Sequence, residues 1–152
     1  MGSLILLSDG LIYVDAQIFI YTVERHPVYF SVLNTLWAAV ASGAVEVVSS
    51  ELTLMETLVG AYRRGDGTLE ADYELFFGYP GIHLIPISRS ILKAAARLRG
   101  TIASLRTPDA LHAATAEAAR ASALLTNDKG FRRIVGLPLT ILDDVLGKSK
   151  PE

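Results

Sequence analysis

The sequence predicts an α/β protein in which helices cover both faces of a mainly parallel sheet, a three-layer α/β/α sandwich. Short apolar runs of strand length, such as residues 11–14 and 123–125, alternate with longer segments whose apolar residues recur at helical spacing. The short runs are continuously apolar, which is typical of parallel strands that are buried on both faces. Strands that alternate with helices in this way favour a parallel sheet between two helical layers.

The composition is that of one globular domain. The chain has 152 residues, of which 51% are hydrophobic and 20% are charged, so it has enough apolar material for one core. We expect a single domain over residues 1–147 and a polar C-terminal tail over residues 148–152. The absence of cysteine excludes disulfides, thiolate metal sites and cysteine nucleophiles. This composition suits the cytoplasm, and no segment is apolar enough to predict a membrane span.

In the first half of the chain, the expected elements are bounded by residues that favour a start or an end. Pro27 is expected to open a helix, because proline is well tolerated in the first helical turn. Ser49 and Ser50 are expected to cap the helix that follows them. The expected elements are a strand at 11–14, a helix from Ala16, a helix from Pro27 to about Gly43, a strand at 45–48 and helices at 51–62 and 69–77.

In the second half, the clearest boundary is Thr107-Pro108-Asp109. It combines an N-cap residue, a proline at the first helical position and a carboxylate in the first turn, and so predicts a helix from Pro108 to about Ala121. Ser88 is expected to cap the preceding helix. The other expected elements are a strand at 82–87, a helix from Ser88 to about Ala103 and strands at 123–125 and 139–142.

Two carboxylates directly follow apolar strands. Asp15 comes after the first expected strand and Asp128 after the fourth. Ligands of parallel sheets bind at the carboxyl ends of the strands, so both belong at the ligand-binding edge. The first-turn position of Asp109 and the helical position of Glu56 allow both to point to the same edge. Taken singly, the last three are also ordinary turn, helix-start and surface residues, whereas Asp15 has apolar neighbours and needs a partner or a role.

Four motifs, taken in order, resemble the signatures of PIN domains, and the VapC-type toxin ribonucleases are the nearest branch. The resemblance covers almost the whole chain. It implies an α/β/α sandwich and a Mg²⁺- or Mn²⁺-dependent endonuclease that cleaves RNA. The motifs are Tyr13-Val14-Asp15-Ala16, a helix after Ser50 that carries Glu56, Pro108-Asp109-Ala110-Leu111-His112-Ala113-Ala114 and Leu125-Thr126-Asn127-Asp128-Lys129-Gly130-Phe131.

The resemblance also implies a site and partners. The acidic quartet of the family, which binds the metal and carries catalysis, falls here on Asp15, Glu56, Asp109 and Asp128. Where the family often has asparagine two residues after the first aspartate, this chain has Gln17. A toxin of this kind acts on RNA, is inhibited by a small antitoxin protein and forms a homodimer.

The chemistry of four close carboxylates explains why a metal is expected. Hard divalent cations prefer oxygen ligands, and Mg²⁺ uses a few carboxylates while it keeps several waters. Carboxylates crowded together repel one another and raise at least one pKa unless a cation lies between them. We expect Mg²⁺ or Mn²⁺ to lower the pKa of an attacking water and to stabilise charge on the phosphoryl oxygens.

Other polar residues near the quartet are candidates for supporting roles. The hydroxyls of Ser50 and Thr126 and the amide of Asn127 are expected behind the metal ligands, where they orient waters or ligands. Helix capping explains the two hydroxyls equally well. His112 lies three residues after Asp109 and is expected to be a structural histidine with satisfied hydrogen bonds.

Two groups of cations are candidate contacts to RNA. Residues 89–152 are basic on balance, whereas residues 1–88 are acidic. One group closely follows Asp128, and the other recurs every four residues as a basic stripe along an expected helix. Contact with phosphates would make RNA binding salt-sensitive, but exposed charges on helix faces explain both groups as well. The first group is Lys129, Arg132 and Arg133, and the second is Arg89, Lys93 and Arg97.

Two other functions are open on the residues alone. A PIN-like module that binds RNA or a protein without cutting is favoured if one member of the quartet does not converge or if no metal binds. A phosphotransfer enzyme with an aspartyl nucleophile, as in haloacid-dehalogenase-like phosphatases, is disfavoured. The second aspartate of that family, two residues after the first, is replaced here by Gln17.

Overall fold

Five parallel strands form one sheet in the computed structural model, which describes residues 10–147. The strand order is β3-β2-β1-β4-β5, so the first strand of the chain lies in the middle. The predicted three-layer sandwich is confirmed, and the sheet is entirely rather than mainly parallel. The strands are β1 (Gly10–Val14), β2 (Val45–Ser50), β3 (Ile82–Ile85), β4 (Ala123–Thr126) and β5 (Leu139–Ile141).

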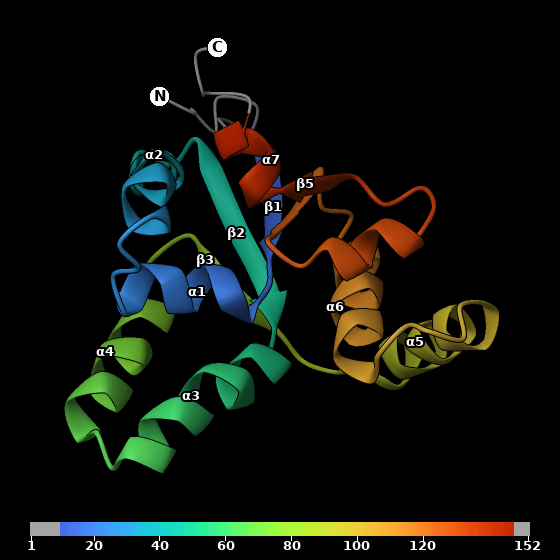
Figure 1. Cartoon of the computed structure of the whole chain (residues 1–152), viewed down its shortest axis with the longest axis horizontal. Helices are drawn as coiled ribbons and strands as arrows, with labels where there is room; N and C mark the ends of the chain where they lie inside the picture. Colours follow the sequence, from blue (N-terminus) through green and yellow to red (C-terminus); the bar gives the residue numbers. More distant parts are fainter. Residues whose placement is uncertain (1–9, 148–152) are drawn as a thin grey trace.

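Helices cover both faces of this sheet. In Figure 1, α1 and α2 lie on one side and α5 and α6 on the other, while α3 lies beyond the end of β2. The helices are α1 (Ala16–Val23), α2 (Tyr29–Ala41), α3 (Leu52–Arg64), α4 (Gly67–Phe77), α5 (Arg89–Thr101), α6 (Thr107–Ala118) and α7 (Leu142–Gly147), and the 3-10 helix η2 spans Lys129–Arg133.

The alternation of side chains along β1 supplies a core to each face of the sheet. Ile12 and Val14 pack with Phe19 and Leu36 on the side of α1 and α2. Tyr13 points to the opposite side and packs with the helices α5 and α6. This continuous burial explains why the strand is apolar at every position.

The helical hairpin of α3 and α4 has its own small core and packs against α1. Leu58 and Tyr73 are buried in it. Gly65, with a φ of 60°, ends α3 in the left-handed conformation that glycine adopts without steric cost. Because α3 follows β2 directly, the hairpin holds Glu56 beside the carboxyl edge of the sheet.

Several predicted boundaries are wrong. The helix predicted to open at Pro27 begins at Tyr29, because the ring of His26 accepts hydrogen bonds from the backbone N–H groups of Val28 and Tyr29. α6 begins at Thr107 rather than Pro108, with Arg106 in the N-cap position.

The two serines before α3 also divide their roles differently from the prediction. Ser49 belongs to β2, and its buried hydroxyl donates to the carbonyl of Val14 instead of capping α3. Ser50 is the last residue of β2, and its Oγ accepts from the backbone N–H of Leu52 at 3.1 Å. The N-cap position of α3 is occupied by Glu51, whose side chain makes no capping bond, so neither serine is the predicted N-cap residue. Both serines therefore help to fix the strand ends from which the site is built.

The C-terminal part of the described chain departs furthest from the prediction. The strand predicted at 139–142 ends at Ile141, and α7 follows without a predicted counterpart. The side-chain carbonyl of Asn127 accepts from the backbone N–H of Asp143, in the first turn of this helix. The predicted tail at 148–152 lies outside the described residues. Between residues 10 and 147, no helix is long and apolar enough to cross a membrane.

Candidate metal centre

All four predicted carboxylates line one cavity of about 280 Å³ at the carboxyl edge of the sheet. Asp15 follows β1, Asp128 follows β4, Asp109 lies in the first turn of α6 and Glu56 lies on α3. Elements far apart in the sequence therefore bring the quartet together, as predicted. The other residues that line the cavity are Ala16, Gln17, Ile20, Arg106, Pro108 and His112.

Asp15 is the most deeply embedded member of the quartet. Only 6% of the residue is exposed to solvent. The hydroxyl of Thr126 donates to Oδ2, while Oδ1 is the one buried side-chain polar atom between residues 10 and 147 that has no hydrogen-bond partner. Burial raises the pKa of Asp15 to about 6. An unpartnered buried carboxylate oxygen is costly, and a cation would satisfy it.

Asp109 and Asp128 share one counter-ion, the guanidinium of Arg106. Nη2 of Arg106 lies 2.9 Å from Oδ2 of Asp128 and 3.4 Å from Oδ1 of Asp109, and Nε lies 3.3 Å from Oδ2 of Asp109. Asp109 is only 5% exposed, and its pKa is therefore raised first by burial and second by the neighbouring carboxylate of Asp128.

The loop after β4 holds Asp128 through the backbone. The N–H of Gly130 donates to Oδ1 of Asp128 at 2.8 Å. A Cβ at residue 130 would lie 3.0 Å from that same oxygen, closer than side chains normally approach. Glycine therefore allows the backbone of η2 to approach the carboxylate directly.

Glu56 is held by a buried chain of hydrogen bonds. Its Oε1 lies 2.6 Å from Nε2 of His112, and Nδ1 of His112 lies 2.6 Å from the hydroxyl of Tyr13. His112 has both ring nitrogens satisfied, as a structural histidine should, but it also lines the cavity and fixes a member of the quartet. Burial raises the pKa of Tyr13, so its hydroxyl stays protonated and can donate.

The residues present fit a hard divalent cation. The donor set consists of carboxylate oxygens, which Mg²⁺ and Mn²⁺ prefer. It includes Oδ1 of Asp15, which has no hydrogen-bond partner and is therefore available to a cation. The set is open, since no three acidic or histidine side chains within residues 10–147 lie close enough together to hold a metal. Three of the carboxylates also have other partners: Glu56 contacts His112, and Arg106 contacts both Asp109 and Asp128.

The three polar residues expected behind the ligands have different contacts. Thr126 contacts the quartet directly, since its hydroxyl donates to Asp15 and accepts from the backbone N–H of Asp128. Ser50 accepts from the backbone N–H of Leu52 at the start of α3. The amide of Asn127 bonds to the hydroxyl of Tyr21 and to the backbone of Asp143, so it ties α1 and α7 together.

The three cations that follow Asp128 are exposed but differently engaged. Arg132 pairs with Asp144 at 2.5 Å, and Arg133 donates to the carbonyl of Ser104 at 3.1 Å. Lys129 forms no ion pair with any residue between 10 and 147. Of this group, Lys129 therefore has the charge most available to a phosphate.

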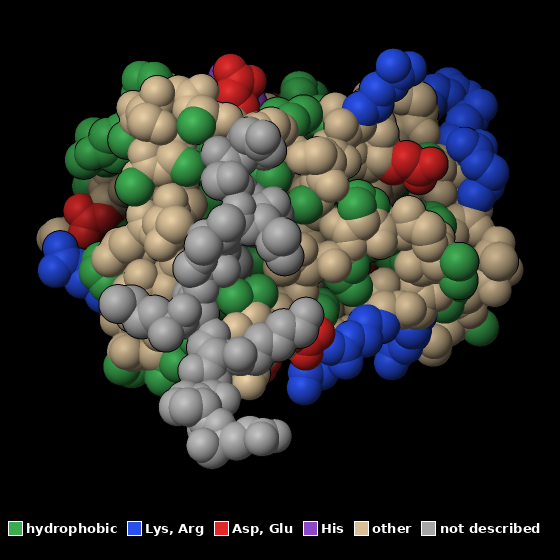
Figure 2. Space-filling view, turned by 90° about the horizontal axis from the view of Figure 1, so that it is seen from above, with side chains coloured by type: hydrophobic (Ala, Val, Ile, Leu, Met, Phe, Trp, Pro, Cys, Tyr) green, Lys and Arg blue, Asp and Glu red, His purple; other side chains and the backbone are tan. Residues whose placement is uncertain are grey.

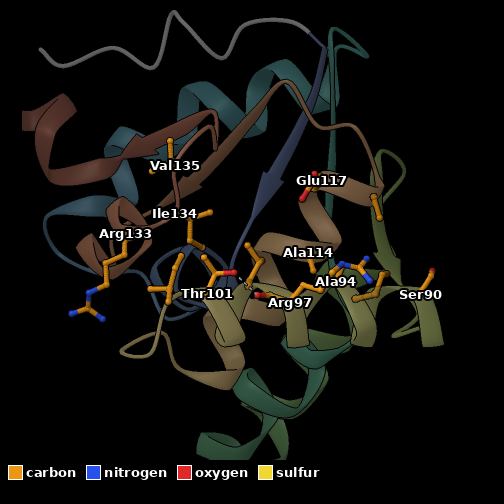
Figure 3. Close-up of a pocket in the computed structure, with 13 residues that line it drawn as sticks. Ser90, Ala94, Arg97, Thr101, Ala114, Glu117, Arg133, Ile134 and Val135 are labelled. Carbon is orange, nitrogen blue, oxygen red and sulfur yellow. Dashed lines mark hydrogen bonds between the residues drawn. The ribbon is translucent and has the colours of Figure 1, made fainter.

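A second, larger cavity of about 540 Å³ lies between α5, α6 and the segment after η2 (Figure 3). Its lining is mostly apolar, and its titratable side chains are Arg97, Glu117 and Arg133.

Arg97 belongs to the basic stripe, whose members are all exposed on α5. Figure 2, which looks onto the end of the molecule opposite the carboxyl edge, shows Lys and Arg side chains gathered mainly on the right-hand side. Of these two cavities, the smaller one is lined by four carboxylates, whereas the larger one is lined by a single carboxylate, that of Glu117.

Two residues of the site were missed by sequence reasoning. The sequence predicts no role at the site for Arg106, and Tyr13 enters the prediction only as part of a motif. The spacing of Arg106, Asp109 and His112 by three residues places them along one side of the start of α6, which was the available signal. For Tyr13, the sequence held no signal beyond its place on the central strand.

Comparisons with known proteins agree with this architecture. The PIN domain family matches residues 12–137 of the chain. A comparison with curated proteins gave no match.

The solved structures that share this fold include the following three. VapBC2 from Rickettsia felis, bound to a DNA fragment from its promoter, aligns with a TM-score of 0.71 at 21% identity over 87% of this chain and 98% of that chain. VapC20 from Mycobacterium tuberculosis, a sarcin-ricin loop cleaving toxin, gives 0.66 at 16% identity over 80% and 92%. VapBC-1 from nontypeable Haemophilus influenzae gives 0.64 at 20% identity over 87% and 98%. At these identities the likeness is one of fold.

Proposed function

The chain belongs to the PIN domain family, and from this premise we propose that it is a divalent-metal-dependent endoribonuclease that hydrolyses RNA phosphodiester bonds. One observation supports this most strongly. Four carboxylates from four separate elements line a single cavity, and the most buried of them has an oxygen without a partner. Such an arrangement is costly for folding and useful for holding a cation.

The residues of the cavity divide the work by their contacts. Asp15, Asp109 and Asp128 are the residues that would hold Mg²⁺ or Mn²⁺, while Glu56 completes the site or orients the attacking water. When bound, the ion lowers the pKa of a water and stabilises charge on phosphoryl oxygens. His112 keeps the carboxylate of Glu56 in place, and Thr126 keeps that of Asp15 in place. Attack in line with the leaving oxygen gives a 5′-phosphate and a 3′-hydroxyl without a covalent intermediate on the protein.

The proposed biological setting is a type II toxin-antitoxin pair in the cytoplasm. Two of the structures that share this fold are VapBC assemblies, and a third is an RNA-cleaving toxin. We therefore propose a small antitoxin as partner, RNA as substrate and a homodimer as the assembled form. Exposed apolar residues on the outer side of α3 offer a surface for such contacts: Met55, Val59 and Tyr62.

One observation favours a second candidate, a PIN-like module that binds RNA or a protein without cutting it. The quartet is not closed, because no three metal-binding side chains of the described chain converge to ligating distance. A module of this kind would keep the fold and the basic residues while it bound no metal.

The decisive experiment measures cleavage of a mixed, structured RNA by purified protein that is free of any bound inhibitor. Cleavage is expected in Mg²⁺ or Mn²⁺ and not in EDTA. Asp15→Asn and Asp109→Asn are expected to lower the cleavage rate by at least about 100-fold. Loss of a residue that only orients a metal ligand already costs about 10- to 100-fold, and these two variants change the proposed ligands themselves. Asp72→Asn, which removes an exposed carboxylate on α4, is the matched control and should cleave normally.

The competing outcomes are distinct. Cleavage that survives in both site variants would contradict the proposed site. Absence of both cleavage and divalent-metal binding would favour the non-cleaving module instead. If the protein does cleave, the cut sites in the RNA mixture identify its target.

A further inference from the structure

The guanidinium of Arg106 contacts both Asp109 and Asp128, two of the carboxylates that we propose as metal ligands. A single nitrogen, Nη2, contacts an oxygen of each carboxylate, at 3.4 Å and 2.9 Å. Carboxylate oxygens that bind Mg²⁺ lie about 2.0 to 2.1 Å from the ion. The two carboxylates cannot close on an ion between them while the guanidinium stays there, because both its volume and its positive charge exclude the ion.

The same contacts show that the guanidinium can leave. The side chain of Arg106 is 68% exposed, whereas that of Asp109 is 7% exposed. Exposed ion pairs contribute little to stability, since water screens them and the long side chain gains freedom when it is released. Arg106 precedes α6 in an extended backbone conformation, and its side chain lies beside the first turn of that helix, where it contacts Asp109. Release therefore requires rotation of one surface side chain and no rearrangement of the core.

We propose that Arg106 is an internal competitor of the divalent cation: its guanidinium bridges Asp109 and Asp128 in the metal-free protein and leaves them when the cation binds. This inference rests on the proposed function and goes beyond it. It explains why a cavity with four carboxylates holds no closed set of ligands, since Arg106 takes the cation's place between two of them. It also means that metal loading frees an arginine at the mouth of the cavity, where guanidinium groups are well suited to bind phosphate.

The first test is calorimetric titration of the full chain with Mn²⁺ alone. Arg106→Gln is expected to bind Mn²⁺ roughly two- to tenfold more tightly than the unchanged protein, because the competing charge is gone. The Mn²⁺ affinity of Arg106→Lys should lie between those of Arg106→Gln and the unchanged protein. Lysine keeps the positive charge but loses the planar guanidinium that contacts both carboxylates. Arg97→Gln removes an equal charge from α5, outside the carboxylate cavity, and should leave the affinity unchanged.

The second test follows the arginine itself by NMR during titration with Mg²⁺. The Nε–H signal of Arg106, assigned by its loss in Arg106→Lys, is expected to shift along the binding curve. The Nε–H signal of Arg99, which donates to the carbonyl of Leu105 at 3.0 Å, is the internal reference and should stay in place.

The outcomes separate this inference from the function on which it rests. If Arg106→Gln binds Mn²⁺ equally well or more weakly, or if the Arg106 signal does not respond to Mg²⁺, the exchange is wrong while the nuclease function stands. If neither the unchanged protein nor Arg106→Gln binds Mn²⁺, the proposed function fails together with the exchange. The melting temperature of each variant shows that it is folded.

Discussion

The buried carboxylate of Asp15 couples the stability of the protein to the state of its site. Burial raises its pKa to about 6, compared with about 4 for an unperturbed aspartate. The folded protein therefore holds this proton over a pH range in which the unfolded chain has lost it. Without a metal, ionisation of Asp15 destabilises the fold, so the contribution of this group is most favourable below pH 4 and is lost as the pH rises to 6.

This coupling predicts a pH-dependent difference between the unchanged protein and Asp15→Asn in EDTA. As the pH rises from about 4 to about 6, the free energy of unfolding of the variant should gain roughly 1 to 3 kcal/mol relative to the unchanged protein and then level off. Denaturant titrations over this pH range measure the difference. The control Asp72→Asn should show no such trend, and a difference that is constant with pH would contradict the prediction.

The hydrogen-bond chain through His112 gives a second prediction for single residues. His112→Gln removes the ring that holds Glu56 and should lower kcat for RNA cleavage about 10- to 100-fold with little change in KM, because positioning rather than binding is lost. Tyr13→Phe keeps the bond between His112 and Glu56 and should cause a smaller loss. Steady-state kinetics separate the two parameters. A loss confined to thermal stability, with normal kcat, would show that the chain is only structural.

The elements of the fold were predictable where local chemistry decides them. Continuous apolar runs gave the parallel strands, and Pro108 with Asp109 placed the start of α6 within one residue. α7 was missed because Asn127, which accepts from the backbone N–H of Asp143 in its first turn, lies sixteen residues earlier in the sequence. The start of α2 was misplaced because the ring of His26 caps it, a role that proline spacing does not reveal.

The close contact between Gly130 of η2 and Asp128 predicts that a methyl group added at residue 130 weakens metal binding. Gly130→Ala would place a Cβ 3.0 Å from Oδ1 of Asp128, so this carboxylate would have to shift slightly from its present position. We expect Mn²⁺ affinity to fall by a few fold, about 1 kcal/mol, without loss of fold stability, since alanine restricts the unfolded chain more than glycine does. Gly67→Ala, at a position with open space around it, is the control for calorimetric and melting measurements. Equal Mn²⁺ affinities in the two variants would contradict the prediction.

For the whole molecule, the convergence of the quartet was predictable but its contacts were not. Topology brings strand ends to one edge whatever their side chains do, so Asp15 and Asp128 were expected there. The bridge from Arg106 to Asp128 and the bond from Glu56 to His112 join residues far apart in sequence. Such contacts depend on side-chain directions in the folded protein, which neither spacing nor propensity specifies.

The uneven charge of the molecule predicts how RNA binding responds to salt. In the Asp15→Asn background, which should not cleave, the slope of log affinity against log salt should fall by about 0.7 in magnitude when Lys129→Gln is added, because one phosphate contact is lost. Arg132→Gln should change it less, since that guanidinium is already paired with Asp144. Filter-binding measurements at several salt concentrations give the slopes. Equal changes from both substitutions would rule out a special role for Lys129.

The central position of β1 has a consequence for the protein during its synthesis. β1 pairs with β2 on one side and with β4, which begins only at Ala123, on the other. A growing chain that has not yet reached Ala123 lacks Asp128, the Thr126 hydroxyl that holds Asp15 and the β4 side of the pairing of β1. Domains fold as units as they emerge at about 5 to 20 residues per second. If the proposed ribonuclease function holds, the protein is made on the ribosome, itself largely RNA, in a form that gains its complete site only when most of the chain has been synthesised.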